Sequence, residues 1–330
     1  ASEMAPQGIA NTAWAFARVR RQDAPLFRAL AEAAVANDAV WTFKPQEISN
    51  IAWAFATVGL PHEQLFEKIM EVAIAWRADL PPQNIANMLW AYAKLVVPAR
   101  CQLFPSLLEV ASGHLEQYKP QEIAAILWAV AREVRNIPVC RDFFKEVPAQ
   151  FTHRLPDFTA QALACMLEAF TLAEVDETDF FNATMGESIS RLSSFQPPSL
   201  CTLLRGIVLK VEKGGPTQVP ADDAQAQTQM YLEVVSRHTS ERLHQMLPHN
   251  MLHLVQTLDM LHPNSRVTSA RALANHHAIV ALQKQRSSSS GSAIMNVQAQ
   301  GCTEGAELFD PSLPLLGHDD VDDPCESASA

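Results

Sequence analysis

The sequence contains little glycine, no paired cysteine motif and no long apolar run. Only 11 of its 330 residues are Gly, which disfavours folds built from strands and tight turns, and also glycine-rich phosphate loops. The six cysteines form no C-x-x-C motif, so free thiols in a reducing compartment are the simplest interpretation. No apolar run approaches the length of a membrane-spanning helix. These absences predict a soluble, mostly helical protein without membrane insertion.

Positive charge is also scarce. The chain carries 25 Lys and Arg against 36 Asp and Glu, a formal net charge of −11. Residues 287–330 hold eight of the acidic residues and no Lys or Arg. Residues 1–286 are therefore nearly neutral, which excludes a strongly basic nucleic-acid-binding domain at the level of composition. Segment 287–330 is rich in serine and then acidic, and we expect it to be disordered because it cannot bury enough apolar surface to fold.

A repeated motif runs through residues 1–286. A Gln preceded by Pro and followed seven residues later by Trp occurs four times, with the Trp residues spaced by 39, 37 and 38 positions. Counted from that Gln, positions +2, +5, +6 and +9 are apolar from the second copy on, which is one stripe of an amphipathic helix. Gln161, Pro198 and His249 open three further copies, which keep the stripe and lose the Trp. The four Trp residues at position +7 are Trp14, Trp53, Trp90 and Trp128.

Each copy leaves room for a second helix. In the second copy Gly59 is expected to end the first helix, and apolar spacing predicts a partner helix over 61–76. Helix pairs repeated every 38 residues or so predict an all-α solenoid of about seven repeats. The repeats are clear over 4–154 and degenerate over 155–285, with a loop insertion expected at 212–224. Because the first copy begins within the motif, we expect that end to continue upstream or to be covered by a partner.

The pattern PQ-x-I/L-x-N-x-x-W-A-x-A resembles the octotricopeptide repeat family and is similar to the related repeats of FAST-kinase-like organellar proteins. The resemblance is clear over residues 4–154, faint over 155–285, and does not include the acidic tail. It implies an α-solenoid in chloroplasts or mitochondria that binds single-stranded RNA and acts in RNA processing, stability or translation. Many members of the family end in a RAP domain, and no such domain is recognisable in this sequence.

Residues at positions +1, +4, +8 and +11 form a second stripe, opposite the apolar one. In a solenoid such positions line up along one surface, as in helical-repeat proteins that read about one base per repeat. We expect the Asn side chains at +4 to bond base edges and the basic side chains at +11 to hold phosphates. The predicted RNA-binding residues are Asn11, Arg18, Asn50, Asn87, Lys94 and Arg132.

Two alternatives stand beside this interpretation. A polar stripe is also what a solvated helix face looks like, and Asn near a helix start can bond the local backbone. Because cations are few and Glu47 and Glu122 at +1 oppose phosphate, RNA affinity is expected to be modest and strongly salt-dependent. The Trp rings are candidates for stacking on unpaired bases, but the small residues at +3 and +10 favour packing between repeats.

No catalytic motif is present: the sequence has no nucleophile elbow, kinase loop, P-loop or HExxH. We therefore expect no enzymatic activity and no cofactor. His249 and His253 have a spacing that can place two imidazoles on one metal ion, but no further ligand completes the set, so no metal site is predicted. The alternative function is a protein-interaction scaffold or a structural subunit of a larger organellar assembly, with protein partners on the concave face or the acidic tail.

Overall fold

The computed structural model describes residues 4–133, 137–175, 177–213 and 223–242. Throughout this part the secondary structure is helical and forms an α-solenoid, as the repeats predict. The degenerate copy at His249 and the acidic segment 287–330 lie outside the described residues. The long helices are α1 (Pro6–Arg18), α2 (Ala24–Val35), α3 (Pro45–Val58), α4 (Glu63–Ala75), α5 (Pro82–Leu95), α6 (Arg100–Gly113), α7 (Pro120–Glu133), α8 (Val139–Phe151), α9 (Ala160–Ala173), α10 (Thr178–Ser190), α11 (Pro197–Lys213) and α12 (Asp223–Glu241).

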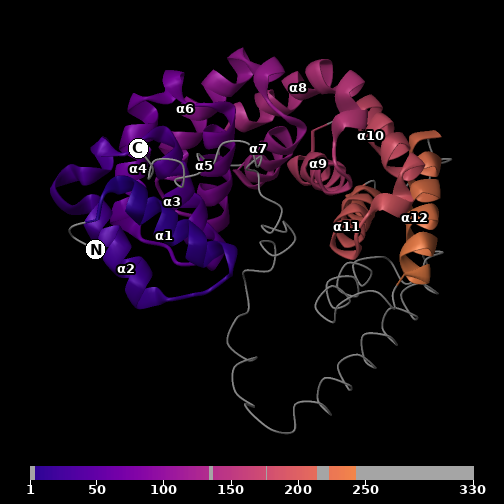
Figure 1. Cartoon of the computed structure of the whole chain (residues 1–330). Helices are drawn as coiled ribbons and strands as arrows, with labels where there is room; N and C mark the ends of the chain where they lie inside the picture. Colours follow the sequence, from indigo (N-terminus) through magenta and orange to yellow (C-terminus); the bar gives the residue numbers. More distant parts are fainter. Residues whose placement is uncertain (1–3, 134–136, 176, 214–222, 243–330) are drawn as a thin grey trace, which may run out of the picture.

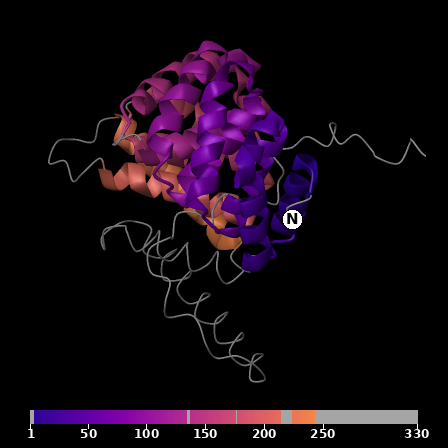
Figure 2. The same cartoon turned by 90° about the vertical axis from the view of Figure 1, so that its left-hand side faces the viewer.

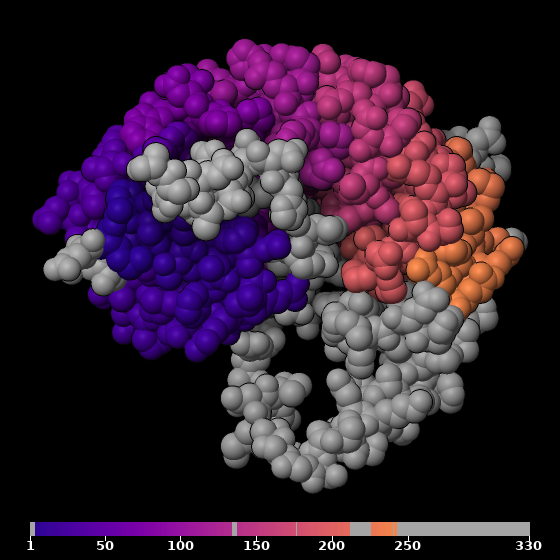
Figure 3. Space-filling view, viewed as in Figure 1, coloured from indigo at the N-terminus to yellow at the C-terminus, as the bar shows by residue number. Residues whose placement is uncertain are grey.

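The helices form two layers of an arc. The odd-numbered helices carry the Pro-Gln motif or its remnants, and each packs against the next odd-numbered helix, which makes them the inner layer (Figure 1). The even-numbered helices form the outer layer. Turned by 90°, the molecule shows the N-terminal end of the arc to the viewer (Figure 2). In the space-filling view the described residues make one continuous body from α1 to α12 (Figure 3).

Each of the first five repeats contains a third element that the apolar pattern did not predict. A 3₁₀ segment follows each outer helix and leads into the next inner helix. The expected insertion at 212–224 is also shorter at both ends, because α11 continues through Lys213 and α12 begins at Asp223. Residues 214–222 lie outside the described part. The 3₁₀ segments are Ala36–Thr42, Arg77–Asp79, Leu115–Gln117, Thr152–Asp157 and Leu192–Ser194.

The inner helices other than α9 begin with a Pro in the first turn, and in α3 and α7 a Glu side chain caps the helix start. The Glu47 carboxylate accepts a hydrogen bond from the backbone N–H of Lys44 at 2.7 Å, and Glu122 accepts one from Lys119 at 2.7 Å. A carboxylate at a helix N-terminus also interacts favourably with the helix dipole. The role that the structure shows for these two acids is therefore capping. In the third repeat the corresponding residue before the helix is Pro81, which has no N–H to donate, and position +1 holds Asn84.

The inner helices also end alike. Position +13 adopts the left-handed conformation in four repeats, with φ between 52° and 70°. Gly59 occupies this position in the second repeat, as the sequence predicts, and suits it because Gly carries no Cβ. The other three repeats place a side chain there, which is Arg20, Val96 or Glu174. The left-handed turn at +13 is therefore a common feature of these repeats and does not require Gly.

The apolar stripe of each inner helix packs between outer helices. Phe55, at position +9 of α3, meets Phe27 of α2 with ring centroids 4.9 Å apart and Phe66 of α4 at 6.5 Å. Phe66 in turn meets Tyr92 of α5 at 5.0 Å, and the Tyr92 hydroxyl donates to the Phe66 carbonyl. A continuous aromatic core therefore crosses from one repeat to the next.

In the later repeats, arginines tie the end of a repeat to its beginning. Each of these arginines lies just after an outer helix. Its guanidinium group donates a hydrogen bond to the backbone carbonyl of an aromatic residue that lies two positions before the inner helix of the same repeat. Arg154 reaches Tyr118 at 3.1 Å and Arg191 reaches Phe158 at 2.5 Å. In the last described repeat Arg242 donates to Phe195 at 2.6 Å.

Candidate nucleic-acid interface

Position +8 of each inner helix faces the preceding inner helix. At Gly206 of α11, an added Cβ would lie 3.0 Å from the backbone nitrogen of Glu168 on α9. The other inner helices carry Ala at this position, and it is buried in α3, α5, α7 and α9. Ala15 of α1, which has no inner helix before it in the described part, is exposed. Small residues at +8 are therefore explained by helix packing, and this part of the predicted polar stripe is not a binding surface.

The side of the inner helix opposite the apolar stripe consists of positions +4, +7 and +11, which lie together on one helix face. Basic residues at +11 stack on the Trp rings at +7 in three repeats. The cation lies 5.3 Å from the ring centroid for Arg18 on Trp14 and 5.0 Å for Lys94 on Trp90. Arg132 approaches the Trp128 ring most closely, at 3.4 Å. We call positions +4, +7 and +11 of the six inner helices the concave row.

The predicted RNA-binding residues lie in this row but differ in exposure. Asn11 and Arg18 of α1 are exposed, whereas Asn50, Lys94 and Arg132 are half-buried. Asn87 of α5 is only 3% exposed. The row therefore becomes less accessible from α1 toward α5.

The Trp rings serve mainly as packing, as their small neighbours predict. Trp90 and Trp128 are each 1% exposed, and their ring centroids lie 6.2 Å apart in a tilted arrangement. Trp53 is also buried, and Trp14 is half-buried. A ring with so little exposed area has no free face for a base, so stacking on bases is restricted to the start of the row.

Two buried amides on α5 have polar atoms without a hydrogen-bond partner within the described structure. These are Oδ1 of Asn87 and Nδ2 of Asn84. A buried polar atom left without a partner costs about 1–3 kcal/mol. Asn84 has no cap to make, because Pro81 lacks an N–H. The two amides therefore leave one acceptor and one donor on α5 that are buried from solvent and lack a hydrogen-bond partner within the described structure.

The concave row changes character at α9. Position +7 holds Glu168, which is 1% exposed, and its Oε1 lies 3.1 Å from Nε of Arg205, the +7 residue of α11. Burial lowers the pKa of Arg132 to about 10, an effect that Arg205 strengthens and that the negative charge of Glu168 opposes. The sequence shows Glu168 and Arg205 in the Trp register, and sequence reasoning missed their importance because their pairing depends on how α9 and α11 approach.

The described cysteines are free thiols. Cys140, Cys165 and Cys201 are buried, and burial raises the pKa of Cys140 and of Cys201 to about 12. Across the described ranges no group of three or more His, Cys, Asp or Glu side chains is placed to hold a metal ion. His249 and His253 lie outside these ranges. No helix of the described part is both long and apolar enough to cross a membrane.

Residues 1–136 match the family model of the RNA-editing substrate-binding complex 6 protein. The match spans α1–α7, the repeats that carry all four Trp residues of the motif and the three cations stacked on them. It covers less than half of the chain. Among curated proteins, none matches the chain. The chain is thus similar, over its N-terminal repeats, to a protein named for a complex that binds RNA-editing substrates, and the narrower octotricopeptide assignment stays a prediction.

Proposed function

We propose that this protein binds single-stranded RNA along the concave row of α1, α3, α5 and α7 and acts in RNA processing inside an organelle. It does so by binding rather than by catalysis, as a component of a larger RNA–protein assembly. The observation that carries the proposal is the recurrence, in register, of a Trp at +7 in all four helices, of an Asn at +4 in α1, α3 and α5, and of a cation at +11 in α1, α5 and α7. The similarity of this same region to a protein of an RNA-editing substrate-binding complex supports it.

In the concave row, different side chains suit different parts of an RNA strand. A cation stacked on an aromatic ring is held in place by the ring quadrupole and keeps its positive charge at a fixed position in the row. Arg132 is fixed further, because its Nη1 donates to the Trp128 carbonyl at 2.9 Å. Phosphates are the natural acceptors for Arg18, Lys94 and Arg132. Asn amides offer a donor and an acceptor to base edges, as helical-repeat readers of RNA do. Phosphate contacts would then position the strand, and the amides would select its sequence.

The small number of cations determines how binding depends on salt. Three phosphate contacts predict that the logarithm of the binding constant falls with the logarithm of salt concentration with a slope of about −2. Binding is expected to be modest at physiological salt and clear at low salt. A slope near zero would contradict phosphate contacts by these side chains.

The direct test is selection of RNA from a randomised single-stranded pool by the full chain, at low and at moderate salt. We expect enrichment of a short motif, and a change in that motif for the Asn50→Ala, Asn87→Ala double variant. Asn182→Ala, a half-buried Asn on the outer helix α10, is the matched control and should select the wild-type motif. Absence of enrichment at low salt, or an unchanged motif in the double variant, would count against the proposal.

A second candidate function is a protein-interaction scaffold, and the C-terminal repeats favour it. Their +11 positions hold Leu172 and Leu209 in place of cations, and α9 and α11 carry no Trp at +7. Co-purification of a stoichiometric protein partner that survives nuclease treatment would support this function. A chain that elutes alone would count against it.

The organellar location rests on the resemblance to organellar repeat families. Fractionation of cells that express the tagged full-length protein tests it, with the protein expected in an organelle and protected from added protease. Recovery in the cytosolic fraction would contradict it.

A further inference from the structure

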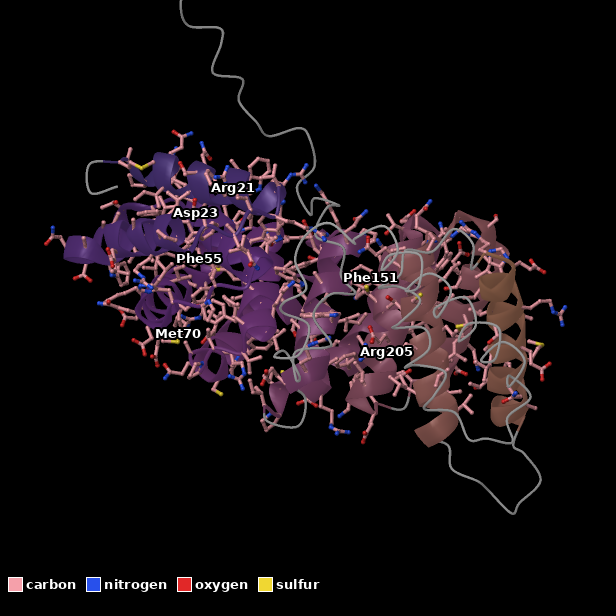
Figure 4. All side chains as sticks on the ribbon, turned by 90° about the horizontal axis from the view of Figure 1, so that it is seen from below. Arg21, Asp23, Phe55, Met70, Phe151 and Arg205 are labelled. Atoms are coloured by element: carbon pink, nitrogen blue, oxygen red, sulfur yellow. The ribbon has the colours of Figure 1, made fainter. Side chains whose placement is uncertain are left out.

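Glu168 stands where the four preceding inner helices have Trp. Its carboxylate is almost fully buried and pairs with Arg205 at 3.1 Å. Gly206 lies directly beside Arg205 in the chain and allows α11 to approach the Glu168 backbone, since a Cβ there would lie 3.0 Å from the Glu168 nitrogen. The pair is therefore held by the packing of the two helices. Figure 4, seen from the open side of the arc, places Arg205 in the C-terminal half of the molecule and Phe55 in the N-terminal half.

The same carboxylate acts on a second arginine. Its negative charge raises the pKa of Arg132, the +11 residue of α7, against the larger effect of burial and the repulsion from Arg205. The charge of one buried acid thus acts on two arginines, which belong to α7 and α11, the inner helices on either side of α9. Beyond it the +11 positions are Leu172 and Leu209. In α9 and α11 the concave row therefore holds one cation, Arg205, and Glu168 already balances its charge.

We propose that Glu168 marks the end of the RNA-binding row, confining the strand to α1, α3, α5 and α7. This inference rests on the proposed function. A phosphate that advanced past α7 would meet the Glu168–Arg205 pair, in which the buried carboxylate offsets the charge of the arginine and cannot swing into solvent. Arg205 is held by Glu168 and is withheld from the strand. At about one nucleotide per repeat, the bound segment would be roughly four nucleotides long.

Replacement of the acid by its neutral isostere tests the inference. Glu168→Gln keeps the shape of the side chain and releases Arg205 for a phosphate. One added contact to single-stranded RNA steepens the salt slope by about 0.7, which corresponds to an affinity gain of roughly eightfold at 50 mM salt relative to a 1 M reference. The measurement is RNA affinity of the full chain across a salt series, with the footprint on the RNA growing by about one nucleotide.

The chain supplies a matched control. Glu133 of α7 is also a buried carboxylate paired with an arginine, Arg100, at 2.7 Å, and it lies outside the concave row. Glu133→Gln removes the same charge and should leave the salt slope unchanged. The double variant Glu168→Gln, Arg205→Gln removes both members of the pair and should return to wild-type affinity.

The outcomes separate the two proposals. Binding by the wild type with equal affinity and slope in Glu168→Gln would overturn this inference and leave the proposed function standing. Failure of every form to bind RNA would overturn both. Ultraviolet crosslinking of RNA to the wild-type protein decides the matter if Glu168→Gln does not fold. Crosslinked peptides are expected from α1–α7, and crosslinks to α9 or α11 would refute a boundary at Glu168.

Discussion

The repeats of α1–α8 and those of α9–α12 share one backbone and differ in the chemistry of the concave row. In the first group a Trp at +7 packs against the next repeat, and a cation usually lies on its ring. In the second group the same position holds the Glu168–Arg205 ion pair. The apolar stripe and the small residue at +8 are present in both groups. The comparison teaches that the apolar stripe and the small residue at +8 specify the solenoid. Position +7 can hold either a packed Trp ring or a member of a buried ion pair.

The largest expected effect tests whether the Trp row is packing. Trp90→Ala should lower the free energy of unfolding by about 3–5 kcal/mol, because it leaves a cavity beside Trp128 in a region with almost no exposed surface. Trp14→Ala, at the half-buried start of the row, should cost less than half as much since its ring already meets solvent. Urea unfolding followed by circular dichroism measures both. An equal loss of unfolding free energy in the two variants would contradict the difference in packing between the interior and the start of the concave row.

A smaller effect tests the close approach of α9 and α11. Gly206→Ala should destabilise by about 1–3 kcal/mol, because the new methyl group would press against the Glu168 backbone. Gly186→Ala, within α10 and with open space around its Cβ, should stabilise by about 0.5–1 kcal/mol through helix propensity. The opposite signs are the expected result in thermal or chemical unfolding. Stabilisation by both substitutions would contradict the close approach of α11 to the Glu168 backbone at Gly206.

The smallest effect tests whether the turn at +13 is common to the repeats. Val96→Gly should stabilise by about 1 kcal/mol, since a β-branched residue is strained at φ 55°. The converse change, Gly59→Ala at φ 70°, should destabilise by a similar amount. Differences in the midpoint of urea unfolding report both. A loss of stability in Val96→Gly would contradict a shared left-handed turn.

Much of the scaffold was predictable from the sequence. The all-α class, the inner helices, the left-handed end at Gly59 and the packing role of Trp90 follow from short-range periodicity and residue size. The predicted helix over 61–76 corresponds to α4, Glu63–Ala75. The 3₁₀ segments were not predicted, because they are short and lack a periodic pattern of their own.

The candidate site was predicted only in part. Periodicity shows which residues share a helix face, but it does not show what that face meets. Position +8 was therefore assigned to a binding surface, although it packs against the preceding helix, and the capping role of Glu47 and Glu122 was not predicted. The repulsion of phosphate by these two acids stays a prediction. Asn84 illustrates the same limit, since the burial of its Nδ2 without an acceptor depends on how the repeats pack.

By itself the sequence determined the repeat, its helices and the chemistry available at each position, because the helices depend on short-range periodicity and the repeat on the recurrence of one motif. The tertiary structure alone decided which side of each inner helix packs against the preceding inner helix and which side forms the concave row, because that depends on the angle at which repeats stack. It also joined Glu168 to Arg205 across 37 positions of the chain. The reason is that a Gly at +8 lets two helices approach until a buried acid and an arginine meet.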